Sequence, residues 1–186
     1  ELKERYGFLI AADEIQSGVG RTGTFNAFTQ FGLDADIIIM AKGIGGGLPL
    51  GAIAGNKRVE NVFTYGEHGS TFGGNPVAAA SGLVVMEELE QGLMESNKTN
   101  GGVLINKLES LQHKYSAKIK EVRGMGLMLG VELTSPGQTV VDELMKRNVL
   151  VNCTNENVIR LLPPYIITKV EIDLFCGKFE EVISGL

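Results

Sequence analysis

The stretch "DIIIMAKGIGGG", residues 36–47, places a lysine between an apolar run and a group of glycines. Three isoleucines and a methionine in a row are typical of a strand that is buried on both faces, as in parallel sheets. Lys42 follows the end of this strand. Because ligands of open α/β sheets bind at the carboxyl ends of strands, we expect Lys42 to face a ligand. A salt bridge, or a side chain that only reaches solvent, is the competing interpretation.

Charges of the opposite sign follow an earlier apolar stretch, "GFLIAADE", residues 7–14. It predicts a strand from Phe8 to about Ala12, after which Asp13 and Glu14 would face the same cleft as Lys42. A lysine amine in a site of reduced polarity can lose its proton and form a Schiff base with a carbonyl group. Pyridoxal phosphate uses such a lysine and requires an acid opposite its ring nitrogen. Asp13 is the natural candidate for that acid.

The remaining sequence indicates two α/β parts, with a boundary near residue 95. In residues 1–95 we expect a helix end before Gly7, a short helix near 25–32, an antiparallel third strand at 51–57 and a helix from Pro76 to about Leu93. In residues 96–186 the pattern predicts helices at 101–115, 139–148 and 168–186, and strands at 119–133, 149–153 and 158–167. Near-continuous apolar strands favour a mostly parallel sheet in the first part.

Composition argues against several classes of partner. The net charge is −5, from 22 acidic and 17 basic residues, and no basic run suits nucleic acid. No apolar run approaches the roughly 18 residues of a membrane span, so we expect a cytoplasmic protein without a membrane partner. Cys153 and Cys176 are expected to be free thiols, and His68 and His113 have no motif partner, so we expect no metal site.

Five motifs in order carry a family resemblance. They are "AADEIQSGVGRTG" at 11–23, "DIIIMAKGIGGGLPLGA" at 36–52, "HGSTFGGNPVA" at 68–78, "RGMGLMLGVEL" at 123–133 and "VIRLLPP" at 158–164. Together they resemble the class III pyridoxal-phosphate aminotransferases, most closely the acetylornithine aminotransferases. The resemblance implies a fold-type-I transferase, with residues 1–95 as the later part of the large cofactor-binding domain and residues 96–186 as the small C-terminal α/β domain.

The resemblance also implies roles for individual residues in binding pyridoxal 5'-phosphate. Lys42 would bind the cofactor covalently and then carry protons, and Asp13 would pair with the ring nitrogen. Ile15 would pack on a ring face, and Gln16 would hydrogen-bond the phenolic oxygen. Taken without the family, Ile15 could be ordinary core and Gln16 a polar loop residue that satisfies local backbone groups.

Three further residues complete the set that the resemblance implies. Ser70 and Thr71 belong to the cofactor site, and Thr71 would contact the phosphate in the neighbouring subunit, which implies a homodimer with a shared active site. Arg160 would grip the α-carboxylate of the amino acid or 2-oxo acid, because a planar guanidinium can hold a carboxylate by two parallel hydrogen bonds. Without the family, Thr71 could satisfy local backbone and Arg160 could form a rim salt bridge.

The implied reaction transfers an amino group between N-acetylornithine and 2-oxoglutarate in arginine biosynthesis. Members of the family are about twice as long as this chain, so we expect a C-terminal part of a longer protein, inactive when isolated. Ornithine, succinylornithine and 4-aminobutyrate aminotransferases share these motifs and remain alternatives. Two other interpretations stay open: a catalytically inactive truncated remnant, and a nucleotide-binding domain that uses "GIGGG".

Overall fold

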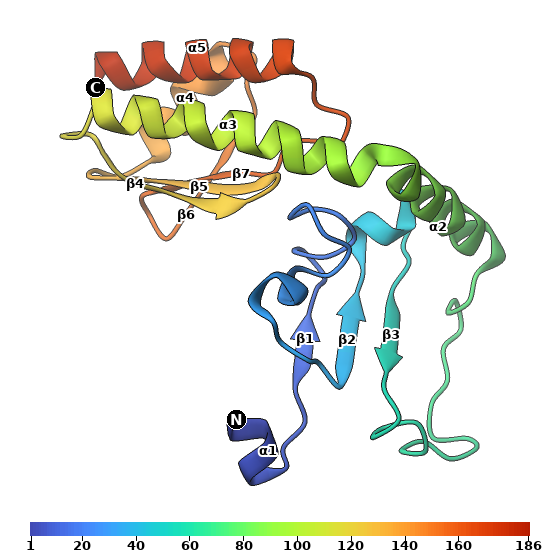
Figure 1. Cartoon of the computed structure of the whole chain (residues 1–186). Helices are drawn as coiled ribbons and strands as arrows, with labels where there is room; N and C mark the ends of the chain where they lie inside the picture. The colour runs from blue at the N-terminus through green and yellow to red at the C-terminus, as the bar shows by residue number, and fades with distance from the viewer. The chain divides into compact units, whose positions relative to one another are not determined.

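Strand β2 (Ile37–Met40) is the central strand of a three-stranded sheet in a computed structural model that describes residues 1–186 (Figure 1). β1 (Ala11–Asp13) runs parallel to it on one side and β3 (Ala52–Gly55) antiparallel on the other. The predicted antiparallel return after the lysine loop is therefore confirmed. The first strand begins later than predicted, because Phe8 and Leu9 are exposed and precede the paired residues.

The chain divides into two compact units, Glu1–Met94 and Glu95–Leu186. Besides its sheet, the first unit holds helix α1 (Leu2–Tyr6), the 3₁₀ helices η1 (Ala27–Phe31) and η2 (Lys42–Gly45), helix α2 (Pro76–Glu88) and the π-helical turn η3 (Leu89–Leu93). The Asn75 side chain accepts hydrogen bonds from the backbone N–H groups of Val77 and Ala78, which fixes the start of α2 beside Pro76. The predicted helix to about Leu93 is thus divided, and Gly92, at φ 119°, leaves the helical path.

A buried carboxylate ties together the segments at the amino end of β2. Asp36, whose side chain is fully buried, accepts hydrogen bonds from Ile10 N–H and Asn56 Nδ2, both at 2.9 Å. It also forms ion pairs with Lys3 at 3.0 Å and Arg58 at 3.1 Å. The backbone N–H of Ile10, with the two cations and the amide, holds the pKa of Asp36 well below its usual range, against the opposing effect of burial.

The second unit is an antiparallel sheet with helices on one face (Figure 1). The strand order is β4-β5-β7-β6, and the helices are α3, α4 and α5. The bounds are α3 (Met94–Lys114), β4 (Ile119–Met125), β5 (Met128–Leu133), α4 (Gln138–Lys146), β6 (Asn152–Thr154), β7 (Val158–Leu161) and α5 (Lys169–Gly185). Leu108, Val131, Ile159 and Phe179 are among the fully buried side chains of its core.

Local sequence explains where two of these elements begin. Thr168 caps α5, since its hydroxyl accepts from Glu171 N–H while the Glu171 carboxylate accepts from Thr168 N–H at 2.8 Å. The strand predicted at 149–153 begins only at Asn152, because Asn148 has φ 58° and Val149 N–H still bonds to the Leu144 carbonyl of α4. Cys153 and Cys176 are free, as predicted.

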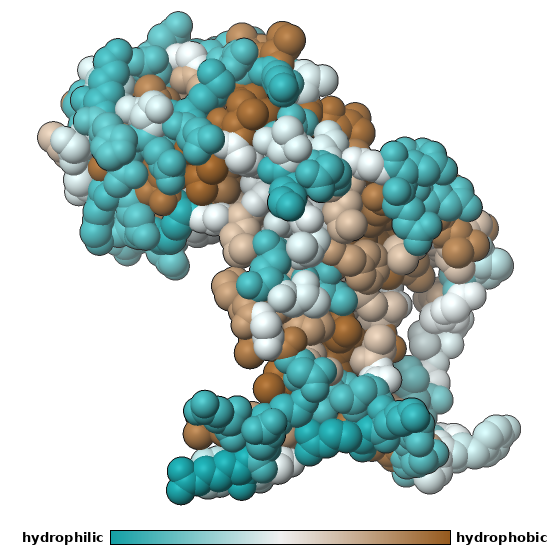
Figure 2. All heavy atoms as spheres, viewed as in Figure 1, coloured by the Kyte–Doolittle hydropathy of each residue, from teal (hydrophilic) through white to brown (hydrophobic).

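The two units differ in how much apolar surface they cover. The second unit buries a contiguous core cluster, whereas large apolar side chains of the first unit lie at its surface (Figure 2). Ile53 of β3 is 75% exposed and Phe72 is 82% exposed. None of the helices combines the length and the apolar character that a membrane span requires.

Candidate active site

Asp13 and Lys42 lie at the carboxyl ends of two neighbouring parallel strands. Asp13 is in register with Ile39, and Glu14 N–H donates to the Ile39 carbonyl at 2.9 Å, three residues before Lys42. Both side chains are exposed and neither takes part in an ion pair. One oxygen of Asp13 accepts a hydrogen bond from Ile15 N–H at 3.1 Å. An acid and an amine at one sheet edge are therefore both available to a ligand.

Helix α2 fixes the turn that carries Lys42. The lysine has a left-handed backbone conformation, φ 51°, at the start of η2. The Ser81 hydroxyl of α2 donates to the Gly45 carbonyl at 2.9 Å. A Cβ on Gly46 would lie 2.8 Å from that hydroxyl oxygen, so α2 can approach only a glycine there. Close packing of α2 against this turn therefore requires a glycine at residue 46.

Glu14 shapes the loop that carries Ile15 and Gln16. Its side chain is buried at 3% exposure and accepts from Ser17 Oγ at 2.8 Å and from Phe28 N–H at 2.9 Å. A buried carboxylate with these donors fixes the path of the chain directly after Asp13. Ile15 and Gln16 are both half-buried at this edge of the sheet.

Ser70 and Thr71 lie on the irregular segment before α2. Both residues are exposed, and Ser70 Oγ accepts a hydrogen bond from Gly73 N–H at 2.9 Å. Glycines at 66, 69, 73 and 74 explain why this segment forms no regular element. Exposure leaves both hydroxyl groups available to a ligand or to another chain.

Arg160 belongs to the second unit, on strand β7. Its Nε donates to Oδ1 of Asn152 at 3.2 Å, and its backbone pairs with Gly130 and Asn152. Arg160 is the one charged residue lining a pocket of about 240 Å³ whose other walls are apolar. Leu150, Pro163 and Phe175 contribute to those walls. No carboxylate of residues 1–186 pairs with this guanidinium, so the alternative of a rim salt bridge has no partner within the chain.

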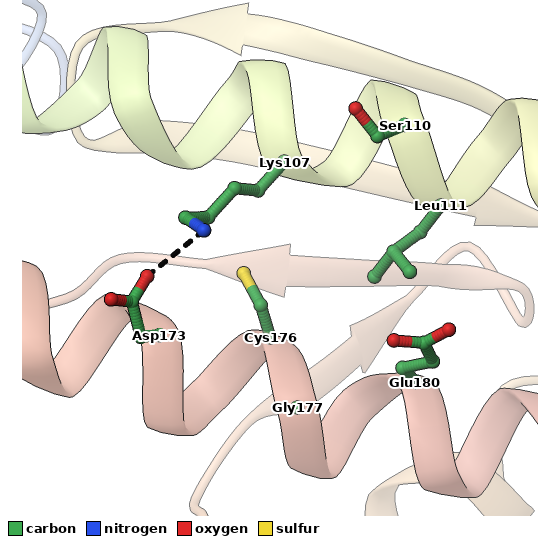
Figure 3. A pocket seen from close by; sticks show the side chains of 7 residues that line it. All are labelled: Lys107, Ser110, Leu111, Asp173, Cys176, Gly177 and Glu180. Carbon is green, nitrogen blue, oxygen red and sulfur yellow. Dashed lines mark ion pairs between the residues drawn. The ribbon is translucent and has the colours of Figure 1, made fainter.

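A larger hollow, about 360 Å³, lies between α3 and α5 in the second unit (Figure 3). Lys107 and Asp173 pair across it at 2.9 Å, and Glu180 pairs with Lys114 at 2.7 Å. Cys176 points into the space between the helices, and burial raises the pKa of its thiol to about 11. With its charges paired and its thiol protonated, this hollow has no group prepared for chemistry.

The sequence from residue 1 to residue 183 matches the family model for the class-III aminotransferases. The chain belongs to this family. This class-III aminotransferase chain is 40% identical, over its whole length, to the acetylornithine aminotransferase of Methanocaldococcus jannaschii. It is 45% identical over 97% of its length to the acetylornithine aminotransferase of Methanosarcina mazei. It spans 47% and 45% of these two relatives, which is about half of each.

Solved structures of aminotransferases have the same fold. The acetylornithine aminotransferase of Elizabethkingia anophelis superposes on the whole class-III chain with a TM-score of 0.91, at 30% identity and over 48% of its own length. The ornithine aminotransferase of Plasmodium yoelii covers 99% of the chain with a TM-score of 0.92, at 30% identity and over 50% of its length. These likenesses confirm the predicted fold class, a partial fold-type-I transferase with an α/β C-terminal part.

Sequence reasoning missed residues that hold the candidate site in place. Ser81 was read only as part of a helix, and Asn152 only as part of a strand. Glu14 does not face the cleft as expected from its place after the strand, because its carboxylate is buried and accepts hydrogen bonds from Ser17 and Phe28. A polar residue inside an otherwise apolar strand, as in "VLVNC", is the one signal that would have drawn attention to Asn152. The glycine run is followed by strand β3 instead of a helix, so the nucleotide-binding interpretation is wrong.

Proposed function

We propose that this chain is the later half of an aminotransferase that transfers an amino group between N-acetylornithine and 2-oxoglutarate, in arginine biosynthesis. The observation that carries the proposal is the pair of unpaired charges, Asp13 and Lys42, at one edge of the sheet in a class-III aminotransferase fold. The choice of N-acetylornithine is supported by relatives of that name at 40–45% identity.

The residues at this edge fit pyridoxal 5'-phosphate. Lys42 offers an amine without a partner in the protein, as covalent attachment of an aldehyde requires. Asp13 offers a carboxylate oxygen for the ring nitrogen, Ile15 an apolar surface for a ring face and Gln16 an amide for the phenolic oxygen. Ser70 and Thr71 offer hydroxyl groups for the phosphate. When bound, the cofactor supplies an electron sink for the negative charge that develops on the substrate carbon.

Each of these side chains has a defined task in the proposed reaction. The Asp13 carboxylate keeps a proton on the ring nitrogen, because an adjacent negative charge favours the protonated form. With the cofactor bound, the Lys42 amine would accept a proton from the substrate carbon and, as an ammonium group, would donate it to the cofactor carbon that takes up the amino group. Arg160 would hold the α-carboxylate by two parallel hydrogen bonds.

Three further features of the proposal concern the whole protein. Thr71 lies on an exposed segment, which supports its assignment to the phosphate site of a second subunit and hence a homodimer. We place the enzyme in the cytoplasm. The isolated chain is proposed to bind the cofactor weakly and to be inactive, since its first unit leaves Ile53, Phe72 and other apolar side chains uncovered.

A second candidate function is transfer from ornithine, which the ornithine aminotransferase structures with TM-scores of 0.90–0.92 support. The test is kcat/KM of the full-length protein with 2-oxoglutarate and four donors: N-acetylornithine, N-succinylornithine, ornithine and 4-aminobutyrate. We expect N-acetylornithine to give the highest value. A higher kcat/KM for another donor would identify that donor as the substrate. Absence of turnover with all four donors would support the interpretation as a catalytically inactive remnant.

A further inference from the structure

One residue from each strand of the second sheet lies in a single row. Arg123 of β4 is in register with Gly130 of β5, Gly130 with Arg160 of β7, and Arg160 with Asn152 of β6. Residues directly opposite each other in antiparallel strands point to the same face. Ile159, next to Arg160 along β7, is buried in the core, so the row lies on the face opposite the core.

The two arginines of this row have different electrostatic partners. Arg123 Nη1 lies 2.6 Å from a Glu121 oxygen and 2.7 Å from a Glu132 oxygen, so two carboxylates neutralise it. Arg160 has no carboxylate partner and donates from Nε to the neutral amide of Asn152 at 3.2 Å. Gly130, between them, brings no side chain against Arg160. The row therefore holds two guanidinium groups on either side of Gly130: carboxylates of the chain neutralise that of Arg123 and none neutralises that of Arg160.

The hydrogen bond from Arg160 determines which part of its guanidinium remains for a ligand. A guanidinium carries five N–H donors in a fixed plane, and a carboxylate can bind two of them in parallel. Asn152 occupies the Nε donor, which leaves the edge formed by Nη1 and Nη2. Because Asn152 also holds the plane in one orientation, that edge is prepared before a carboxylate arrives.

The absence of charge on the Asn152 side chain matters for Arg160 as much as its position does. An aspartate at residue 152 would accept the same hydrogen bond but would compensate the charge of Arg160, as Glu121 and Glu132 do for Arg123. A substrate carboxylate would then have to compete with an internal one. An amide orients the guanidinium and leaves its full charge for the ligand.

We propose that Asn152 is a positioning residue for the carboxylate grip of Arg160, and that its neutral amide keeps this cation available to substrate. The inference rests on the proposed function, in which Arg160 binds the α-carboxylate. It adds a residue that touches no substrate and acts through the orientation and charge of Arg160.

The test compares Asn152→Ala and Asn152→Asp in the full-length holoenzyme. Asn157→Ala is the matched control, because Asn157 lies near the same strands and its side chain also makes one hydrogen bond, to the Leu133 carbonyl at 2.9 Å. We expect Asn152→Ala to raise KM for 2-oxoglutarate about tenfold with kcat within about twofold, and Asn152→Asp to raise it further. Inhibition by glutarate, a dicarboxylate that cannot react, should weaken by the same factors.

Three results would overturn the inference. Unchanged KM and unchanged glutarate inhibition in both Asn152 variants would overturn it while leaving the proposed function intact. An equal rise in KM for Asn157→Ala would assign the effect to general loosening of the sheet. Absence of turnover in the unaltered enzyme with every donor would reject the proposed function, and this inference with it.

Discussion

Asp13 lies opposite Ile39 in the β1–β2 ladder, and Lys42 follows Ile39 by three residues, so the acid and the amine emerge at one edge of the sheet. The two opposite charges do not pair with each other. In a stable surface pair the charges would compensate one another, whereas here each remains available to a third group. This relationship underlies the assignment of the edge as a cofactor site.

Replacing Lys42 by alanine tests the reactive amine. We expect Lys42→Ala in the full-length enzyme to lower the rate of amino transfer by roughly 10³-fold or more, because no other side chain replaces its amine in proton transfer. Lys57→Ala, which removes another exposed lysine of the first unit, is the control and should keep its rate. Retained turnover in Lys42→Ala would refute the role of Lys42.

Asp36 should make the stability of the chain dependent on pH in acid. Its pKa is lower in the folded chain than the usual 3.8, so its stabilisation is present above that value and is lost as the pH falls toward the folded value. We expect Asp36→Asn to lower the melting temperature at pH 7 and to flatten its decline between about pH 5 and pH 2, where the folded chain still holds the carboxylate ionised and the unfolded chain protonates it. Asp34→Asn, at an exposed neighbour of Lys3, should decline as steeply as the unaltered chain. If the melting temperatures of Asp36→Asn and of the unaltered chain fell equally steeply with decreasing pH, the result would contradict this account.

Helix α3 crosses the β4–β5 turn at a glycine. A Cβ on Gly101 would clash with the backbone of Gly126, whereas a Cβ on the adjacent Gly102 would contact nothing within 4 Å. We expect Gly101→Ala to destabilise the chain by about 1–3 kcal/mol, because the backbone must move. Gly102→Ala should stabilise it by about 0.5–1 kcal/mol through helix propensity. Urea unfolding measures both, and equal effects would show that the contact is not close.

The thiol of Cys176 should react slowly with alkylating reagents. With a pKa of about 11, about one molecule in a thousand carries the thiolate at pH 8. In a Cys153→Ser variant, which leaves Cys176 as the one thiol, we expect iodoacetamide labelling to accelerate about a hundredfold between pH 8 and pH 10. Circular dichroism at both pH values checks that the fold persists. A rate that does not change with pH would contradict the assignment.

Local sequence patterns predict the strands of the first sheet, but they do not predict the side-chain contacts that hold its segments together. The apolar run at Ile37–Met40 indicates a strand, and Lys42 after it indicates the end of the strand where a ligand would bind. Both features can be recognised because they depend on residues that are neighbours in the sequence. No sequence pattern assigns a role to Asp36, although it binds groups from residues 3, 10, 56 and 58. Such partners are brought together by folding and have no fixed spacing in the sequence.

In the helices, too, features that depend on neighbouring residues were predicted and features that depend on distant contacts were not. The starts of the helices near Thr168 and at Pro76 were predicted, since each start depends on residues within one turn. The division at Gly92 was not, because a glycine in a helical pattern is compatible with a continuous helix as well as with a break. The pairing of Asn152 with Arg160 depends on the register of β6 and β7 across the turn that joins them. A one-residue shift would place Asn152 on the opposite face.

The most direct measurement is borohydride reduction of the full-length protein after addition of pyridoxal 5'-phosphate, followed by mass analysis of its peptides. The account predicts one stable adduct, on Lys42, which is lost in Lys42→Ala and retained in Lys57→Ala. An adduct spread over several exposed lysines, or no adduct on Lys42 at saturating cofactor, would contradict the assignment of this sheet edge as the cofactor site.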